Sequence, residues 1–371
     1  MYKWQKDGVQ KTMKKILFVA QNMQIGGTRK ALVNHLKTMP DGDDVSLFTF
    51  GDGPLLDEVP SFVRVIKGRR LLRLVATPFQ LVLGSRNFVD IFLRILLMIL
   101  VRLIGSERLY LWLLKGYCDE SYDTAISYFT DVPRNYFNQG TNLFVSAYVQ
   151  AKEKIAWIHN DPIDGKFDQA HCEKIYRQFD HLVCVSYAIK DRFAEFLPQY
   201  ADKLAVYHNR FPVAEIQAQA GETSPYPADG YHIVTVARVD NLQKRTDGIV
   251  KLCARLHNEG IDSFCWHIVG GGPDLPGNQQ LARELGVEEQ VCFEGAMTNP
   301  FPYIKFADLF ALYSAYEGYP MVVGEAQALN TFILTTNYAA ATEQITPEQG
   351  VIAESDEAFY QELKRLLLCR S

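Results

Sequence analysis

Short runs of apolar, often β-branched residues recur along the chain and alternate with segments of helical periodicity. The first run is KKILFVAQN at 14–22, and a glycine turn and an amphipathic helical pattern follow it in MQIGGTRKALVNHLK. Strands buried on both faces of a parallel sheet are continuously apolar, and helices form the crossovers between them. The alternation therefore predicts an α/β fold built on doubly wound parallel sheets.

A polar segment with two prolines and two glycines, AEIQAQAGETSPYPADG at 214–230, interrupts this alternation. At 371 residues the chain is long enough for two domains. We therefore predict two Rossmann-like domains that face a central cleft, one at 1–213 and one at 231–371, with 214–230 as the linker. The strands are expected within 14–22, 45–50, 124–129, 154–159, 181–186 and 204–209, and then within 231–239, 263–273, 289–295, 307–314 and 331–337.

Charge is distributed unevenly along the chain. The net charge of −5 argues against a general nucleic-acid binder. Residues 64–115, however, hold ten basic residues and only two acidic ones, which makes this segment strongly positive. Such a local imbalance predicts an anionic partner for one face of the N-terminal domain.

The seven cysteines form no CxxC pair and lie at least twelve residues apart. Their odd number, and the apolar runs around Cys184 and Cys292, predict buried free thiols in a reducing cytoplasm. No metal site is predicted. The first residues, MYKWQKDGVQKTMKK, are polar and basic and do not resemble a secretory signal.

The segment 71–116 is unusually apolar, and its core at 88–105 is long enough to suggest a membrane span. Asp90, Arg94 and Arg102 argue against a span, because each charge costs about 2.5–3.5 kcal/mol near the bilayer centre. Two interpretations remain: core-packed helices with snorkelling arginines, or a basic amphipathic surface that lies on anionic lipid. The excess of positive charge over 64–116 favours the second. The predicted lipid contacts are Arg86, Arg94 and Arg102.

Two glutamates stand eight positions apart in YSAYEGYPMVVGEAQAL at 313–329, on either side of a Gly-Tyr-Pro turn. Glu317 falls where a strand ends, and Glu325 falls inside the following helix. An isolated pair of this kind is more often two solvated carboxylates on a surface loop. Two further motifs change that interpretation: VARVDNLQKRTDG, with Arg238 and Lys244, and the glycine turn VGGGPD at 269–274.

Together and in this order, these motifs resemble the donor-binding half of the retaining GT-B glycosyltransferases of family four. The resemblance covers nearly the whole chain and is strongest from 231 to 345. It implies that Arg238 and Lys244 bind the donor diphosphate and stabilise the charge on the leaving group. It also implies that Glu317 accepts hydrogen bonds from the transferred sugar, and that Glu325 binds the ribose hydroxyls.

The N-terminal half carries weaker parts of the same resemblance. QIGGTRK is similar to the family's first glycine loop, and KIAWIHND is similar to its cleft motif, so His159 is expected to contact the donor sugar or the acceptor. A lone histidine in such a strand is otherwise more often a core residue. The implied catalytic residues are His159, Glu317, Arg238 and Lys244. The implied donor-binding residues are Gly26, Gly27, Gly271, Gly272, Gly318, Tyr319, Pro320, Met321 and Glu325.

The chain departs from the family pattern at two places. It has Asn330-Thr331-Phe332 where relatives carry Gly-x-Pro, and Ala340-Ala341 where they carry two glycines. Asparagine can adopt the left-handed backbone that a helix C-terminus needs, so we expect the fold to tolerate the first change. The alanines could crowd the phosphate loop. The last helices of the family are expected to be short or missing.

The resemblance implies a metal-independent, retaining hexosyltransferase that uses a nucleotide sugar, with a UDP-sugar favoured, and needs no other cofactor. The acceptor would be a lipid-linked glycan in bacterial capsular or exopolysaccharide synthesis, and the enzyme would lie in the cytoplasm on the inner face of the plasma membrane. The alternative is a non-catalytic GT-B subunit that binds a partner transferase or a glycan. The departures at 330–332 and 340–342 keep this alternative open.

Overall fold

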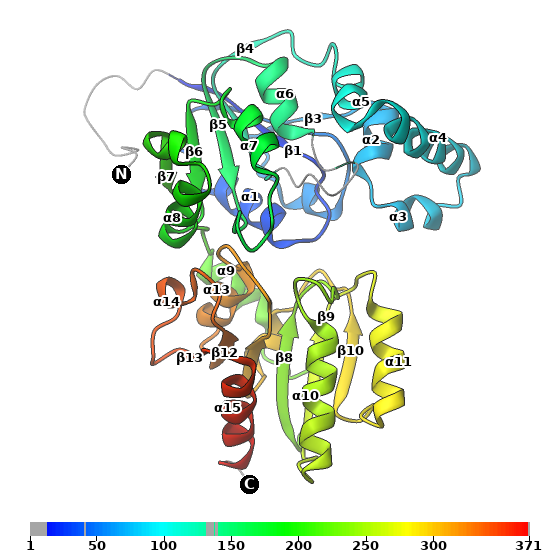
Figure 1. Ribbon diagram of the computed structural model, residues 1–371, viewed down its shortest axis with the longest axis vertical. Coiled ribbons are helices and arrows are strands. Elements are labelled where there is room, and N and C mark those ends of the chain that lie inside the picture. The colour runs from blue at the N-terminus through cyan, green and yellow to red at the C-terminus, as the bar shows by residue number, and fades with distance from the viewer. Residues whose placement is uncertain (1–12, 41, 131–136, 138–139, 370–371) are drawn as a thin grey trace. The chain divides into compact units, whose positions relative to one another are not determined.

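The computed structural model describes residues 13–369, except 41, 131–136 and 138–139. The chain divides into two compact units, which we call unit 1 (1–210) and unit 2 (211–371). Each unit is an α/β domain with helices on both sides of a parallel sheet (Figure 1). The predicted fold class, two Rossmann-like doubly wound domains, is confirmed.

The sheet of unit 1 has seven parallel strands in the order β3-β2-β1-β4-β5-β6-β7. Strand β1 lies near its middle, and its residues Ile16 and Phe18 are fully buried, as expected for a strand covered on both faces. The strands are β1 (Lys15–Ala20), β2 (Asp44–Thr49), β3 (Arg64–Lys67), β4 (Ser121–Ser127), β5 (Gln150–Ile158), β6 (His181–Cys184) and β7 (Leu204–Val206).

Helices connect successive strands of unit 1, and four of them gather in one group between β3 and β4 (Figure 1). The α-helices are α1 (Gly27–Lys37), α2 (Arg70–Ala76), α3 (Phe79–Gly84), α4 (Phe88–Ile104), α5 (Ser106–Leu113), α6 (Thr141–Ala147), α7 (Gln169–Tyr176) and α8 (Tyr187–Phe196); short 3₁₀ helices are η1 (Pro54–Glu58) and η2 (Pro198–Lys203).

The sheet of unit 2 has six parallel strands in the order β10-β9-β8-β11-β12-β13. The strands are β8 (Tyr231–Val236), β9 (Phe264–Val269), β10 (Val291–Gly295), β11 (Leu309–Leu312), β12 (Ile333–Thr336) and β13 (Gly350–Ala353). The helices are α9 (Val213–Ala220), α10 (Thr246–Asn258), α11 (Leu275–Leu285), α12 (Phe301–Lys305), α13 (Met321–Ala328), α14 (Ala341–Gln344) and α15 (Asp356–Leu368).

The core of unit 2 is centred on Trp266 of β9, whose side chain is fully buried. Its indole Nε1–H donates to the Thr235 hydroxyl at 2.9 Å, so the one polar atom of the indole is satisfied inside the core. The Thr235 hydroxyl in turn donates to the carbonyl of Ala311 at 2.6 Å. This chain of contacts ties β9, β8 and β11 together beneath the ends of the strands that carry the candidate site.

Two strands were not predicted, and both lie at sheet edges. Strand β3 has the sequence RVIK and is mostly exposed, so it lacks the apolar run that marks a central strand. Strand β13 has the sequence GVIA, which is too short to give a clear pattern. The edge position of β3 leaves one of its sides open to water, and its sequence is therefore less apolar.

The segment assigned to the linker, 214–230, contains most of helix α9. Ile216 and Ala220 of this helix are buried, and the helix packs against α12 and α13 of unit 2. The division between the two units lies before it, between Arg210 and Phe211. Helix α9 is short and buries only one stripe of side chains, which explains why this segment has few large apolar residues.

Helix α4 has apolar residues on two faces. One stripe, formed by Arg94, Leu97 and Val101, is buried against the neighbouring helices α2, α3 and α5. The Arg94 guanidinium lies 4.1 Å from the centre of the Phe137 ring and donates to the carbonyl of Thr77 at 3.5 Å. The prediction that Arg94 contacts lipid is therefore wrong, because its side chain is enclosed by protein.

The other two predicted contacts, Arg86 and Arg102, are exposed. Within the part of the chain that the structure covers, none of the helices combines the length and the apolarity needed to cross a bilayer.

Candidate functional site

The residues implied at the donor follow the carboxyl ends of neighbouring strands in unit 2. Arg238 and Lys244 follow β8, the glycine turn follows β9, and Glu317 follows β11. These three strands are adjacent in the sheet order β9-β8-β11 and parallel, so their carboxyl ends share one edge of the sheet. Open parallel sheets bind ligands at this edge.

Lys244 and Glu317 form a direct ion pair between Nζ and Oε1. The side chains are 16% and 8% exposed, so the pair is largely removed from water. Burying one charge without a partner costs several kcal/mol, and each side chain therefore fixes the position of the other. The structure thus brings together two predicted residues that are 73 positions apart in the chain.

Gln243, which sequence reasoning did not single out, holds the two segments of this ion pair together. Its main-chain carbonyl accepts the N–H of Ala315 at 2.8 Å, and its side-chain Nε2 donates to the carbonyl of Tyr316 at 3.3 Å. These two contacts immediately precede Lys244 on one segment and Glu317 on the other. Gln243 is therefore a positioning residue, because it sets the register between the two loops.

Arg238 and Arg245 do not take part in this ion pair. Arg238 pairs with Asp240 at 2.7 Å, and its side chain is more than half exposed. Arg245 has a left-handed backbone (φ 50°) at the start of α10 and makes two contacts to Asp356, at 2.8 and 2.5 Å. The backbone conformation of Arg245 turns its side chain toward α15, whereas Lys244 faces Glu317.

The glycine turn after β9 packs against the segment that leads to Arg238. A Cβ atom on Gly270 would lie 1.8 Å from the carbonyl oxygen of Ala237, and one on Gly272 would lie 2.1 Å from that of Val239. Gly271 has room for a side chain, with Ala296 at 3.4 Å. Gly270 and Gly272 are therefore required for close packing of the two loops, and Gly270 was missing from the predicted set.

The Gly-Tyr-Pro turn leads directly into α13, which begins at Met321 with Pro320 as its N-cap. Gln344 holds this turn, because its Nε2 donates to the Pro320 carbonyl at 3.0 Å while its Oε1 accepts from the Tyr338 hydroxyl at 2.9 Å. Proline has no side-chain oxygen that could cap the first-turn amides of α13. These amides and the positive end of the helix dipole can therefore act on an anion.

Glu325 lies in α13 and is 7% exposed, as buried as Glu317 at 6%. The interpretation of the two glutamates as solvated surface carboxylates is therefore wrong. Glu317 also contributes to the electrostatics of its surroundings, because burial and the negative charge of Glu317 both raise the pKa of Tyr338. Burial, and then the charge of Glu343, likewise raise the pKa of Tyr319.

The two departures from the family pattern fit the backbone. Asn330 follows the last turn of α13 in the left-handed region at φ 57°, where glycine is otherwise preferred, so the expectation for this residue is confirmed. Ala340 has φ −98° and ψ 11°, a conformation open to any residue, and Ala341 begins the short helix α14. Neither alanine strains the backbone.

In unit 1, Gly26 is the N-cap of α1 and Gly27 is its first residue, so the predicted glycine loop is the turn between β1 and α1. A Cβ on Gly26 would lie 2.9 Å from the flexible guanidinium of Arg29. The cleft motif lies at the end of β5, where Asp161 is fully buried and pairs with Arg192 of α8. Asp161 thereby ties the loop after β5 to the next helix.

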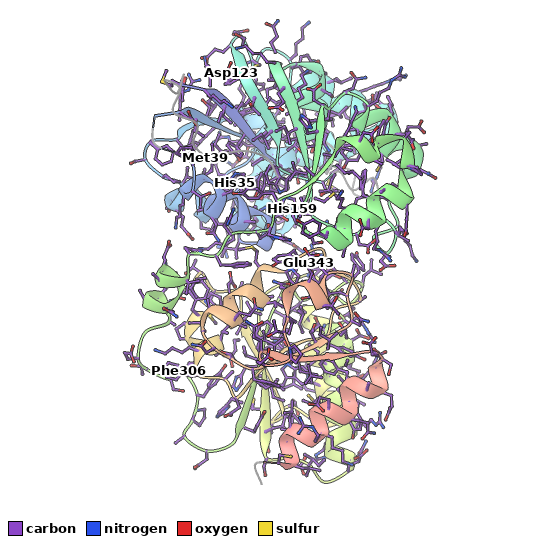
Figure 2. All side chains as sticks on the ribbon, turned by 90° about the vertical axis from the view of Figure 1, so that its left-hand side faces the viewer. His35, Met39, Asp123, His159, Phe306 and Glu343 are labelled. Atoms are coloured by element: carbon purple, nitrogen blue, oxygen red, sulfur yellow. The ribbon has the colours of Figure 1, made fainter. Side chains whose placement is uncertain are left out.

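His159 is buried beside Tyr128 and His35 (Figure 2). Its Nε2 lies 3.0 Å from the Tyr128 carbonyl, which can only accept, so Nε2 carries the proton and Nδ1 is left as an acceptor. Burial lowers the pKa of His159 to about 3 and that of His35 to about 4. Both imidazoles are therefore neutral near pH 7, and His159 can act there as a hydrogen-bonding group but not as an imidazolium acid.

Comparison with known proteins agrees with this geometry. Residues 222–371 match the family "Glycosyl transferases group 1". An uncharacterized glycosyltransferase of Methanocaldococcus jannaschii is 22% identical over 219 residues, which are 56% of this chain and 53% of that protein. The lipopolysaccharide 1,6-galactosyltransferase of Salmonella typhimurium is 38% identical over 90 residues, which are 23% of this chain and 24% of that protein.

The matched stretches thus span about half of the first relative and about a quarter of the second. Among solved structures, Anabaena HepE in complex with UDP-glucose aligns with a TM-score of 0.66 at 17% identity, covering 96% of this chain and 89% of that one. This likeness shows the fold of the chain, which is that of the GT-B glycosyltransferases. The segment that is similar to the glycosyl transferases group 1 family, residues 222–371, includes every predicted donor-site residue of unit 2.

Proposed function

We propose that this chain is a glycosyltransferase that moves a hexose from a nucleotide sugar to a lipid-linked glycan in bacterial surface polysaccharide synthesis. The observation that carries the proposal is the buried ion pair of Lys244 and Glu317 beside the N-terminus of α13. An ammonium carries three protons, so Lys244 can bind phosphate while it keeps its contact with Glu317. The solved relative HepE was crystallised with UDP-glucose, which supports a UDP-sugar as the donor.

The chemistry assigned to the donor residues follows from charge. The bond between the anomeric carbon and the diphosphate breaks, and negative charge grows on the leaving phosphate. Lys244, Arg238 and the first-turn amides of α13 stabilise this charge, so the proposed transfer needs no metal ion. Glu317 and Glu325 accept hydrogen bonds from sugar hydroxyls, Glu317 on the hexose and Glu325 on the ribose.

Retention of configuration follows if the acceptor oxygen attacks from the face that the phosphate leaves. In this front-face displacement the acceptor hydroxyl gives its proton to an oxygen of the departing diphosphate, which removes the need for a protein nucleophile. The neutral imidazole of His159 offers Nδ1 to a sugar hydroxyl. Glu317 is committed to Lys244 and serves as a binding group in this scheme.

Calorimetric titration with UDP and GDP tests donor binding, with two matched controls. Glu325→Gln and Lys244→Met should each lower the affinity for the preferred diphosphate by tenfold or more, about 1.4 kcal/mol or above. Glu354→Gln and Lys251→Met change exposed residues of the same unit and should leave the affinity unchanged. Equal effects in both sets would refute the assigned donor site. No binding of any nucleoside diphosphate or sugar nucleotide by the wild type would support a non-catalytic subunit instead.

The anomeric configuration of the product tests the mechanism separately. A donor with an α-linked sugar should give an α-linked product, as observed by the anomeric coupling in proton NMR. A β-linked product would refute front-face displacement and leave donor binding intact. Transfer that persists after dialysis against a chelator is expected, because the cationic side chains supply the charge compensation.

The outer stripe of α4 supports the membrane part of the proposal. Phe88, Phe92, Ile99 and Leu103 recur at helical spacing on this stripe, and Phe88 and Leu103 are 84% and 74% exposed. Contiguous apolar patches of this kind are rare on soluble monomers. The exposed Arg86 precedes the stripe by two positions in the chain, and the stripe lies within the segment 64–115 that holds the excess of basic residues.

We assign an anionic lipid bilayer as the partner of this stripe, because apolar insertion and cationic flanks act together on such a surface. Vesicle flotation should show stronger binding when phosphatidylglycerol is added to phosphatidylcholine. The double substitution Phe88→Ser with Phe92→Ser should weaken binding at least tenfold, whereas Leu285→Ser, an exposed leucine of unit 2, should not. The assignment would be refuted if vesicle binding changes neither with the content of acidic lipid nor with the phenylalanine substitutions.

A further inference from the structure

A cluster of thiol and imidazole side chains lies on one face of the unit 2 sheet, near the beginnings of strands β8, β9 and β10. Figure 1 shows these three strands side by side. Cys265 and His267 are two positions apart on β9, so they point to the same face. His232 of β8 is level with Cys265, and Cys292 of β10 is level with His267. Glu294, two positions beyond Cys292, completes the cluster and contacts His267.

Three of these residues offer ligand atoms at close range. One atom from each of Cys265, His267 and Cys292 lies within 4.8 Å of the other two, and the two sulfurs are 2.7 Å apart. Over the described ranges this is the one trio of histidine, cysteine or acidic residues with such a spacing. The imidazole is 6% exposed, while the thiols are partly exposed and so can be reached from solvent.

The contacts of His267 resemble those that orient a metal ligand. Its Nδ1 lies 2.7 Å from Glu294 Oε1, and its Nε2 lies 3.1 Å from His232 Nδ1. His232 Nε2 lies 3.2 Å from the carbonyl of Pro227. The series from Glu294 through His267 and His232 to the Pro227 carbonyl has three contacts, and each contact needs one hydrogen. Two neutral imidazoles hold only two N–H groups between them. A cation bound at one His267 nitrogen, in place of its present partner, would leave two contacts for the two N–H groups.

The register of the strands makes the two cysteines diagonal neighbours instead of directly opposite ones. Val291 is level with Trp266, so Cys265 is level with Gln290, two positions before Cys292. Diagonal neighbours on paired strands lie farther apart than directly opposite residues, at about 7–8 Å in antiparallel pairs. A disulfide needs about 4.4–6.8 Å, whereas a metal ion bridges side chains over a longer span.

We propose that Cys265, Cys292 and His267 bind a zinc-class divalent ion, with Glu294 or a water molecule in the fourth position. The two thiols lose their protons on binding, and the two thiolates balance the charge of the ion. Tetrahedral zinc holds its sulfurs at about 2.3 Å and so about 3.8 Å from each other. The sulfurs must therefore separate by about 1 Å, a movement within the reach of side-chain rotation on fixed strands.

The position of the cluster indicates a structural role. It lies at the beginnings of the strands, whereas Lys244 and Glu317 follow their ends. Tyr226 stacks on His232 with a ring spacing of 4.5 Å, and Tyr303 of α12 donates to Glu294 at 3.2 Å. An ion here would fasten β9 to the edge strand β10. This inference is independent of the proposed transferase activity.

Metal analysis of the whole purified chain tests the proposal. Protein grown with zinc and desalted should carry about one equivalent of zinc per chain. Cys265→Ser and His267→Gln should reduce this content to about a tenth, while Cys118→Ser and Cys369→Ser, which change thiols outside the cluster, should retain it. Replacement by Co²⁺ should give the visible absorption of a tetrahedral thiolate complex, and this absorption should vanish in Cys292→Ser.

Several results would overturn the proposal. One is a wild type that carries no stoichiometric zinc and gives no cobalt–thiolate spectrum. Another is zinc that remains in the substituted chains, which would identify adventitious binding. A mass two hydrogens lower, with Cys265 and Cys292 protected from alkylation until a reductant is added, would identify a disulfide instead. The wild-type measurements keep the test valid even if one of the variants fails to fold.

Discussion

The ion pair of Lys244 and Glu317 makes a quantitative prediction about the stability of unit 2. Glu317→Gln keeps the shape of the side chain but leaves the Lys244 ammonium opposite a neutral amide. Breaking a buried ion pair on one side costs about 3–5 kcal/mol, and exposed pairs contribute about 0–1 kcal/mol. Lys244 is 16% exposed and the amide oxygen still accepts a hydrogen bond, so we expect a loss of about 2–3 kcal/mol.

This loss converts into a measurable change in melting temperature. For a domain of about 150–250 residues, 1 kcal/mol shifts Tm by about 2–4 °C. Unit 2 falls in this range, so Glu317→Gln should lower the Tm of its transition by roughly 4–12 °C. Differential scanning calorimetry of the whole chain suits this measurement, because a second transition from unit 1 should stay in place.

Two comparisons make the result specific. Arg238→Gln breaks the exposed pair with Asp240 and should cost less than about 1 kcal/mol. The double substitution Lys244→Met with Glu317→Leu removes both charges and should recover most of the stability lost by Glu317→Gln. The reasoning is refuted if Glu317→Gln costs no more than Arg238→Gln, or if the double variant is less stable than either single variant.

Three further predictions concern the backbone and the buried histidine. Asn330→Ala should cost about 1 kcal/mol because of the left-handed φ, and Asn330→Gly should cost nothing, as urea unfolding can show. Gly270→Ala should destabilise unit 2 strongly, because its Cβ would overlap the Ala237 carbonyl, whereas Gly271→Ala should be tolerated; equal melting temperatures would contradict this. His159 has its pKa lowered to about 3, so unfolding at low pH takes up a proton, and stability should fall as pH drops from about 6.5 toward 3. His159→Gln should flatten the slope of unfolding free energy between pH 7 and 5, and an unchanged slope would exclude this cause.

The central strands and the order of the elements follow from the sequence because they depend on local patterns. Strand β1 is apolar after its first residue, Lys15, since helices cover both of its faces, and a short apolar run of this kind is typical of a buried strand. Edge strand β3 carries charged residues because one of its sides faces water, and its pattern resembles a loop. The sequence alone therefore predicts the middle of each sheet better than its edges.

Some residues of the candidate site could likewise be predicted from the sequence, and others could not. Lys244 and Glu317 could be proposed together because each belongs to a motif, although 73 positions separate them. Gln243 and Gln344 could not, because their roles depend on carbonyl groups that only the folded chain brings within reach. Gly270 was missed for a related reason, since a glycine required by a close backbone contact looks like its neighbours in the sequence.

The thiol–imidazole cluster could not be found from the spacing of cysteines and histidines in the sequence. Those rules recognise ligands that are close in sequence, as in paired cysteines on one loop. Cys265 and His267 share a strand, but Cys292 is 27 positions from Cys265 and reaches it through the pairing of β9 with β10. The expectation of a buried thiol at Cys292 was also inexact, because this side chain is partly exposed at the sheet edge.

Helix α4 shows why charge alone is a poor guide to a membrane surface. Apolar residues occupy both of its faces, so its sequence does not fix which face is turned inward. The structure settles this, because Arg94 shares the buried stripe with Leu97 and Val101, held by the Phe137 ring and the Thr77 carbonyl. Burial lowers the pKa of Arg94 to about 10, which is still too high for the guanidinium to lose its charge near pH 7. Arg94 is therefore enclosed by protein, and the proposed contact with lipid would rest on the exposed apolar side chains of α4 and on the exposed Arg86 and Arg102.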